Sequence, residues 1–261
     1  MKPASTLDYA YAVGRVRTLE RRLIPRSLFH EACDDEDFAS ALKEVFDAGV
    51  FIQELKEIKD SRELDQFIRN EEEYLLDDVQ HLFLDKPFRQ VFHHLWSPDK
   101  ALELVRESGN RFIIEYFRRL IDLGNLKMLA RTKYLDGGER LLRPRLMPGG
   151  FLAHERIIAG IDLSFTEFGD SIRSTPYGKI WADGADALEN EETFIDLERG
   201  MEDFLMRYLR EAKYITFGPE PVFAYTLGRK QELGLLRILG VGKLNRMPPD
   251  MIKRRMSETY V

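Results

Sequence analysis

The 261-residue sequence contains a single cysteine, Cys33. A lone cysteine excludes an internal disulfide and is typical of a protein from a reducing compartment. No run of about 18 apolar residues occurs, so the sequence predicts no membrane-spanning helix. Residues 1–20 contain Arg15 and Arg17 and lack an apolar core, which argues against a secretory signal peptide. We therefore expect a cytosolic protein.

The sequence also lacks an excess of positive charge. It has 39 basic and 45 acidic residues, for a net charge of −6. This balance disfavours a general nucleic-acid-binding protein, which needs a basic surface. The hydrophobic content of 44% and charged content of 32% are typical of a soluble protein rich in amphipathic helices.

No convincing alternation of apolar and polar residues, the pattern of a β-strand, occurs, and short apolar pieces such as Tyr214–Phe217 are the only alternatives to helix. Apolar residues instead recur every three or four positions, most regularly at Phe194, Leu197, Met201, Phe204, Tyr208 and Ala212. Helix start signals occur at Asp34 or Asp35, Asp60-Ser61, Ser97-Pro98, the capping box Ser164-x-x-Glu167, and Thr175-Pro176. The sequence predicts an all-α fold, with long helices over 7–24, 111–133 and 222–239.

The segment Gly240-Val241-Gly242-Lys243 has glycines near a lysine, as a phosphate-binding loop does. Such a loop also needs a glycine five positions before the Gly-Lys pair and a Ser or Thr after the lysine. Arg237 and Leu244 occupy these positions, and Asn245 stands where a dinucleotide motif needs its third glycine. The segment follows a predicted helix, whose carbonyl end disfavours phosphate. We infer no nucleotide site here.

A short motif recurs three times: an apolar residue, glycine, any residue, an apolar residue, Lys or Arg, any residue, and leucine. Its glycines, Gly14, Gly124 and Gly234, are equally spaced along the chain. Chance similarity among amphipathic helices is the alternative, and it applies most to the first copy. The second and third copies also share Lys133 and Lys243. A domain-sized period predicts three related helical units around a pseudo-threefold axis. Their expected bounds are 1–96, 97–174 and 175–261.

The C-terminal segment contains an ordered set of motifs: Gly218-x-Glu220-Pro221, Gly242-Lys243-Leu244-Asn245, Pro248-Pro249 and Tyr260-Val261. This set resembles the end of the C subunit of bacterial and archaeal V/A-type rotary ATPases, whose eukaryotic relative is the d subunit. The segments "LIDLGNLKMLARTK", "LMPGGFL" and "YAYAVGRVRTLERRLI" are also similar to that family. The stretch from Glu31 to Asp99 carries no such motif, and the chain is shorter than the family typically is.

The resemblance implies three similar helical domains that form a funnel. It implies a non-catalytic central-rotor subunit that couples the central stalk to the membrane rotor ring in ATP-driven transport of protons or sodium. The expected partners are the stalk subunits and the ring, and the expected location is peripheral, at the cytoplasmic face of the membrane. Gly242-Lys243 would then belong to a helix-ending turn in a structural subunit.

A helical enzyme and a generic scaffold or adaptor are the alternatives. His93 and His94 could suggest a metal site, but adjacent histidines on a helix point about 100 degrees apart. Glu71-Glu72-Glu73 is more typical of a solvated acidic face than of an acid–base pair. Cys33 has His30 nearby but no orienting acid, and a core or boundary position is expected for it. We predict no catalytic, metal-binding or cofactor-binding residue.

Four basic side chains and one asparagine on or just after the repeated helices are the candidates for partner contact. They recur between copies or fall in the family motifs: Lys127, Arg131, Arg237, Lys243 and Asn245. The cluster Arg246, Lys253, Arg254 and Arg255 could also meet an acidic subunit or anionic headgroups. The alternative is structural, because basic residues at helix ends neutralise terminal carbonyls.

Overall fold

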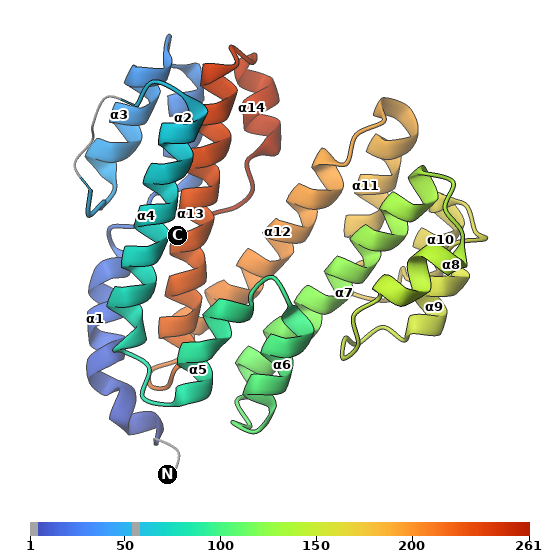
Figure 1. Cartoon of the computed structure of the whole chain (residues 1–261), viewed down its shortest axis with the longest axis horizontal. Helices are drawn as coiled ribbons and strands as arrows, with labels where there is room; N and C mark the ends of the chain where they lie inside the picture. The colour runs from blue at the N-terminus through green and yellow to red at the C-terminus, as the bar shows by residue number, and fades with distance from the viewer. Residues whose placement is uncertain (1–4, 54–57) are drawn as a thin grey trace. The chain divides into compact units, whose positions relative to one another are not determined.

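The computed structural model describes residues 5–53 and 58–261. Within these ranges the chain is helical, with no strand (Figure 1). The all-α prediction is confirmed, and the competing segment Tyr214–Phe217 has no strand either. No helix in the described ranges is long and apolar enough to cross a membrane.

Contacts group the chain into two compact units. One comprises the chain up to Arg89 together with Met206–Val261, and the other comprises Gln90–Leu205. The unit boundaries fall within α5 (Lys86–Gln90) and α12 (Ile195–Arg210). The division into three related units stays a prediction.

The first unit is built around α13 (Glu220–Leu244), which packs against α1, α2, α3, α4 and α14. Figure 1 shows α13 alongside α4 and α14. Its buried residues lie on all sides of the helix, as expected for a helix at the centre of a bundle. The surrounding elements are η1 (Thr6–Tyr9), α1 (Ala10–Glu20), α2 (Arg26–Asp34), α3 (Phe38–Ala48), α4 (Ser61–Gln80), η4 (Glu211–Tyr214) and α14 (Pro249–Arg255).

The second unit is built around α7 (Arg111–Tyr134), which packs against α6, α8 and α9. Trp181 lies in its core, edge-on to Phe168 with ring centroids 4.6 Å apart. The other elements are η2 (Val91–His94), α6 (Pro98–Arg106), α8 (Glu139–Leu142), η3 (Arg143–Arg145), α9 (His154–Ala159), α10 (Phe165–Ser171) and α11 (Gly178–Glu191).

Two predicted helix starts carry the expected cap. The Asp60 carboxylate accepts hydrogen bonds from the backbone N–H groups of Arg62 and Glu63, each at 2.9 Å. The capping box is formed reciprocally: Glu167 N–H donates to Ser164 Oγ at 3.1 Å and Ser164 N–H donates to the Glu167 carboxylate at 2.8 Å. Both caps need only residues within one turn of each other, which is why the sequence predicts them well.

Three helix boundaries differ from the prediction. Asp37, not Asp34 or Asp35, caps α3, because α2 itself continues to Asp34. The helix after Thr175-Pro176 begins at Gly178, since the Thr175 hydroxyl bonds back to the Ile172 carbonyl and holds a turn there. The first helix ends at Glu20, short of the predicted residue 24.

The glycines of Gly240–Lys243 lie inside α13, which continues to Leu244 rather than ending at residue 239. A Cβ at Gly240 would lie 2.5 Å from Leu64 Cδ2, and one at Gly242 would lie 2.7 Å from Ile252. Both glycines therefore allow close packing, of α4 and of α14 respectively. The segment is the last turn of a helix, which agrees with its interpretation as a helix end and not a phosphate loop.

The second and third copies of the repeat end with the same backbone geometry. Asp136 and Arg246 occupy equivalent positions in the two copies, and they have left-handed φ values of 51° and 54°. One residue later, Gly137 N–H donates to the Thr132 carbonyl at 2.8 Å, and the equivalent bond from Met247 to the Gly242 carbonyl is 2.9 Å. This is the hydrogen-bond pattern of a Schellman helix end.

The equivalence continues beyond the helix end. Helices α8 and α14 begin at Glu139 and Pro249, which are again equivalent positions, and each helix buries one anchor residue, Leu142 or Ile252. These shared features support the structural equivalence of the second and third copies of the repeat. The first copy departs: α1 has 11 residues, whereas α7 has 24.

Candidate interaction site on the long helices

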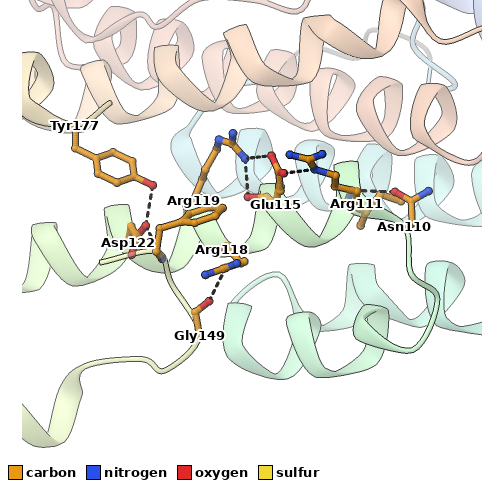
Figure 2. Close-up of polar contacts among 10 residues, drawn as sticks. Asn110, Arg111, Glu115, Arg118, Arg119, Asp122, Gly149 and Tyr177 are labelled. Atoms are coloured by element: carbon orange, nitrogen blue, oxygen red, sulfur yellow. Dashed lines mark hydrogen bonds and ion pairs between the residues drawn. The ribbon is translucent and has the colours of Figure 1, made fainter. Parts of the chain in front are cut away.

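Charged side chains line the N-terminal half of α7 (Figure 2). Asn110 caps the helix by accepting the Ile113 N–H at 3.0 Å. One turn on, Glu115 accepts hydrogen bonds from Arg111 at 2.7 Å and Arg119 at 2.9 Å. The bond from Arg111, with that from Arg119, holds the pKa of Glu115 below its usual value. These bonds fix the side chains along one face of the helix.

A buried carboxylate, Asp122, lies at the centre of the same helix. It accepts three hydrogen bonds: from the Tyr177 hydroxyl at 2.7 Å, the Phe151 N–H at 2.9 Å and the Leu152 N–H at 3.0 Å. Burial, together with the nearby Asp122 charge, raises the pKa of the Tyr177 hydroxyl, so Tyr177 remains a donor. A buried carboxylate is stable only when its oxygens are satisfied in this way.

The Gly149-Gly150 pair of the "LMPGGFL" motif closes over this carboxylate. Gly149 has a φ of 102°, which favours glycine. A Cβ at Gly150 would collide with the Asp122 carboxylate. Arg118 holds the turn by donating to the Gly149 carbonyl at 3.2 Å (Figure 2) and to the Gly150 carbonyl at 3.1 Å. Its guanidinium also lies 3.9 Å from the Phe151 ring centroid. The motif therefore serves to fasten a loop to α7.

The first unit has a buried carboxylate at the equivalent position of α13. Glu232, which corresponds to Asp122 in the repeat, accepts the Ile24 N–H at 2.6 Å and a hydrogen bond from Arg229 at 2.6 Å. Burial raises the pKa of Glu232 to about 7. Sequence reasoning missed both carboxylates, although aligning the second and third copies of the repeat places an acid at this position in each.

The predicted contact residues of the second unit share one partner. Lys127 and Arg131 both pair with Glu198 of α12, at 2.7 and 2.8 Å. The side chain of Arg131 remains 53% exposed, so its outer face is reachable. At this exposure the ion pairs contribute little to stability.

The predicted residues of the first unit also have intrachain contacts. Arg237 pairs with Asp65 of α4 at 2.9 Å, which repeats the arrangement of Lys127 in the second unit. Lys243 donates to the Asp35 carbonyl just after α2, and Asn245 donates to the Val241 carbonyl at 2.8 Å. All three contacts join residues of the first unit. Contact of the five residues with a partner stays a prediction.

Two other basic residues bind the open carbonyl ends of neighbouring segments. Lys133 Nζ donates to the carbonyls of Gly160, Ile161 and Leu163, which follow α9. Arg17 of the first copy donates to three carbonyls in 212–215 at 2.8–3.0 Å. Cations at carbonyl ends stabilise the turns that hold these segments.

Cys33 and the His, Asp and Glu side chains are the groups that a catalytic or metal site would use. Cys33 is fully buried, and burial raises the pKa of its thiol to about 11, so it is a core residue and not a nucleophile. In the described ranges no three His, Cys, Asp or Glu side chains converge as a metal site would require. A cavity of about 630 Å³ lies between α10 and α11, lined by small residues such as Gly169, Ala182 and Ala185 and by charged side chains.

The buried carboxylates Asp122 and Glu232 thus bind donors of the chain itself, and Lys127, Arg131 and Arg237 are paired within the chain but partly exposed. A family model described as ATP synthase (C/AC39) subunit matches residues 52–255. The chain belongs to this family. The resemblance inferred from the motifs is thereby confirmed, and the match includes much of the Glu31–Asp99 stretch that carries no recognised motif.

Three relatives within this family illustrate the similarity. The C subunit of the V-type sodium ATPase of Enterococcus hirae is 22% identical over 217 residues, covering 83% of this chain and 63% of the relative. The C subunit of the A-type ATP synthase of Thermococcus gammatolerans is 22% identical over 226 residues, covering 84% and 61%. Its counterpart in Thermococcus onnurineus is 26% identical over 157 residues, covering 59% and 42%. The chain thus spans less than two-thirds of the length of these relatives.

Proposed function

We propose that this chain is a non-catalytic coupling subunit of a V/A-type rotary ATPase. It would join the central stalk to the membrane rotor ring during ATP-driven ion transport, as a peripheral protein at the cytoplasmic face. The observation that carries the proposal is the family match over residues 52–255. The names of the relatives, which are C subunits of a V-type sodium ATPase and of A-type ATP synthases, support it.

The internal structure of each unit supports a mechanical role. A coupling element transmits torque only if it resists deformation, and close-packed helical cores have low compressibility. Each unit has a long helix, α7 or α13, whose buried carboxylate binds backbone N–H groups of another segment. We further propose that three related units, at 1–96, 97–174 and 175–261, form a funnel around a pseudo-threefold axis.

The partner contacts proposed for this role are Lys127, Arg131, Arg237, Lys243 and Asn245. The side chains of Lys127 and Arg237 pair with carboxylates inside their own units and are still 37% and 43% exposed. Charged residues that are oriented but reachable favour specific orientation of a partner. Stalk subunits and the ring are the partners expected to supply complementary acidic groups.

The test is to delete and restore the gene in the organism that encodes it. Membrane vesicles without the chain should keep ATP hydrolysis by the catalytic head but lose ATP-driven ion uptake, and the restored chain should recover it. Tagged chain isolated from the same membranes should bring down stalk, catalytic and ring subunits, identified by mass spectrometry.

Two results would contradict the proposal. Recovery of the chain alone, from membranes with an intact rotary ATPase, would favour a scaffold or adaptor with another purpose. Unchanged ion uptake after deletion would exclude a coupling role, and a helical enzyme would then become the alternative to test.

A further inference from the structure

A small cavity lies in the first unit, where α1 and α4 both pack against α13 (Figure 1). Its volume is about 120 Å³. Leu19, Leu23 and Leu75 form an apolar part of its wall, and polar side chains complete it. Apolar walls with a few polar groups are typical of sites that bind small molecules.

Tyr225 of α13 is a polar group of this wall without a partner. The residue is only 7% exposed, yet its hydroxyl has no hydrogen-bond partner among the residues that the structure describes. Burial raises the pKa of Tyr225 to about 12, so the hydroxyl stays protonated and can donate. Because a buried tyrosine hydroxyl normally has a partner, this one points to an acceptor inside the cavity.

The two carboxylates of the wall already have donors within the chain. Glu71 is buried and accepts the backbone N–H groups of Ile52 at 3.1 Å and Gln53 at 2.9 Å. Asp78 forms an ion pair with Arg15. A cationic ligand would therefore compete with donors that both carboxylates already have.

The two arginines of the wall differ from each other. Arg229 is buried and donates to Glu232 at 2.6 Å and to the Val50 carbonyl. Arg22, just after α1, is exposed and has no side-chain partner among the described residues. The polar groups left for a ligand are thus two donors, the Tyr225 hydroxyl and the Arg22 guanidinium.

We propose that this cavity binds a short-chain aliphatic carboxylate. Its oxygens accept a hydrogen bond from Tyr225, its charge is balanced by Arg22, and its alkyl chain packs against the leucines. The volume limits the ligand to about five non-hydrogen atoms, since a cavity of about 150 Å³ accommodates benzene. Propionate has this size. The site is independent of the coupling role, because all its residues belong to the first unit.

Titration of the full chain with propionate, followed by NMR at constant ionic strength, tests the proposal. Propionate should shift the signals of Leu19, Leu75 and Tyr225 in a saturable way, with a Kd on the order of 1 mM for so small a ligand. Propionamide has the same shape without the charge and should bind about tenfold more weakly. Propylammonium, which carries the opposite charge, should produce no saturable shift.

Conservative variants assign the binding to the two donors. Tyr225→Phe keeps the packed ring and should weaken propionate binding about tenfold, because it removes the hydrogen bond to the carboxylate. Arg22→Gln changes an exposed side chain and should weaken binding about fivefold. The matched controls are Tyr74→Phe and Arg21→Gln, two exposed residues outside the cavity wall, and both should keep the Kd within about twofold.

Three results would overturn the proposal. The absence of a saturable shift up to about 50 mM propionate, well above the expected Kd, would show that the cavity holds only water. Equal affinity for propionate and propionamide, or tighter binding of propylammonium, would exclude an anion site. Unchanged propionate binding by folded Tyr225→Phe would exclude the hydroxyl as the recognising group.

Discussion

The long helices α7 and α13 occupy equivalent positions of the repeat, yet they are stabilised from different parts of the chain. Asp122 of α7 bonds to Leu152 and Tyr177, which are 30 and 55 residues away. Glu232 of α13 bonds to Ile24, which is 208 residues away. The second unit is therefore stabilised by contacts within a continuous stretch of chain, whereas the first requires α13 to pack against the N-terminal segments.

The two carboxylates also differ in their electrostatics. The three donors of Asp122 are neutral groups, one hydroxyl and two backbone N–H groups. Glu232 has one backbone donor and Arg229, which itself lies 4.0 Å from Glu71. The same position in the repeat thus supports a cluster of neutral donors in one unit and a buried charge network in the other.

The largest effect is expected from removing the carboxylate of the neutral-donor cluster. Asp122→Ala should destabilise the second unit by about 4 kcal/mol, because it leaves the Tyr177 hydroxyl and two buried backbone N–H groups unsatisfied. Urea unfolding measures the loss, and hydrogen exchange localises it to residues 90–205. The control Tyr177→Phe removes one of three bonds and should cost about 1 kcal/mol. Equal losses in the two variants would show that Asp122 is not the organising group.

The second-largest effect is expected from the titration of Glu232, the buried carboxylate of the charge network. The folded-state pKa of Glu232 is raised to about 7, so the folded protein binds this proton more tightly than the unfolded chain, whose pKa is near 4.5. The contribution of Glu232 to stability is therefore complete below about pH 4.5 and is lost as the pH rises through about 7. The loss is of the order of 3 kcal/mol.

Glu232→Gln tests this prediction, since the amide does not titrate. Urea midpoints measured from pH 5 to pH 8 should fall for the natural chain and fall less for the variant. The comparison between the two proteins removes the contribution of all other titrating groups. Identical slopes would exclude Glu232 as the group responsible.

A smaller change in stability is expected on replacing two glycines of α13, and its sign should differ between them. Gly240→Ala should destabilise the first unit by about 2 kcal/mol, because its Cβ would lie 2.5 Å from Leu64 Cδ2. A Cβ at Gly234 would meet nothing within 4 Å, so Gly234→Ala should stabilise the helix by up to about 1 kcal/mol. Thermal unfolding measures both. Stabilisation by both alanines would show that Gly240 is not a packing residue.

The smallest stability effect concerns the repeated ion pairs. Lys127→Ala and Arg237→Ala should each change the free energy of unfolding by less than about 0.5 kcal/mol, because both side chains are more than one-third exposed. If these residues contact a partner, retention in the ATPase should fall nonetheless. A stability loss above about 1 kcal/mol, with retention unchanged, would assign them a purely structural role.

Local signals account for most of what was predicted correctly. Asp60 and the Ser164–Glu167 pair lie within one turn of the groups that they cap, so the sequence alone identifies them. The start at Asp37 was missed, because Asp34 and Asp35 are equally good caps by type and only the length of α2 decides among them. The five candidate contact residues were identified from the repeat or from the family motifs, but their intrachain partners Glu198, Asp65 and Asp35 were not.

The amino-acid sequence by itself determined the all-helical fold, the equal spacing of the repeated motif and the family, since these depend on periodicity and on motifs read along the chain. Tertiary structure decided which residues meet across long separations: Glu232 with Ile24, Gly240 with Leu64, and the Gly149-Gly150 turn with Asp122. The type of a side chain does not indicate which residue far along the chain it will contact. Close packing brings these groups within contact distance. It therefore decides whether a glycine is needed for packing and whether an acid is buried and hydrogen-bonded.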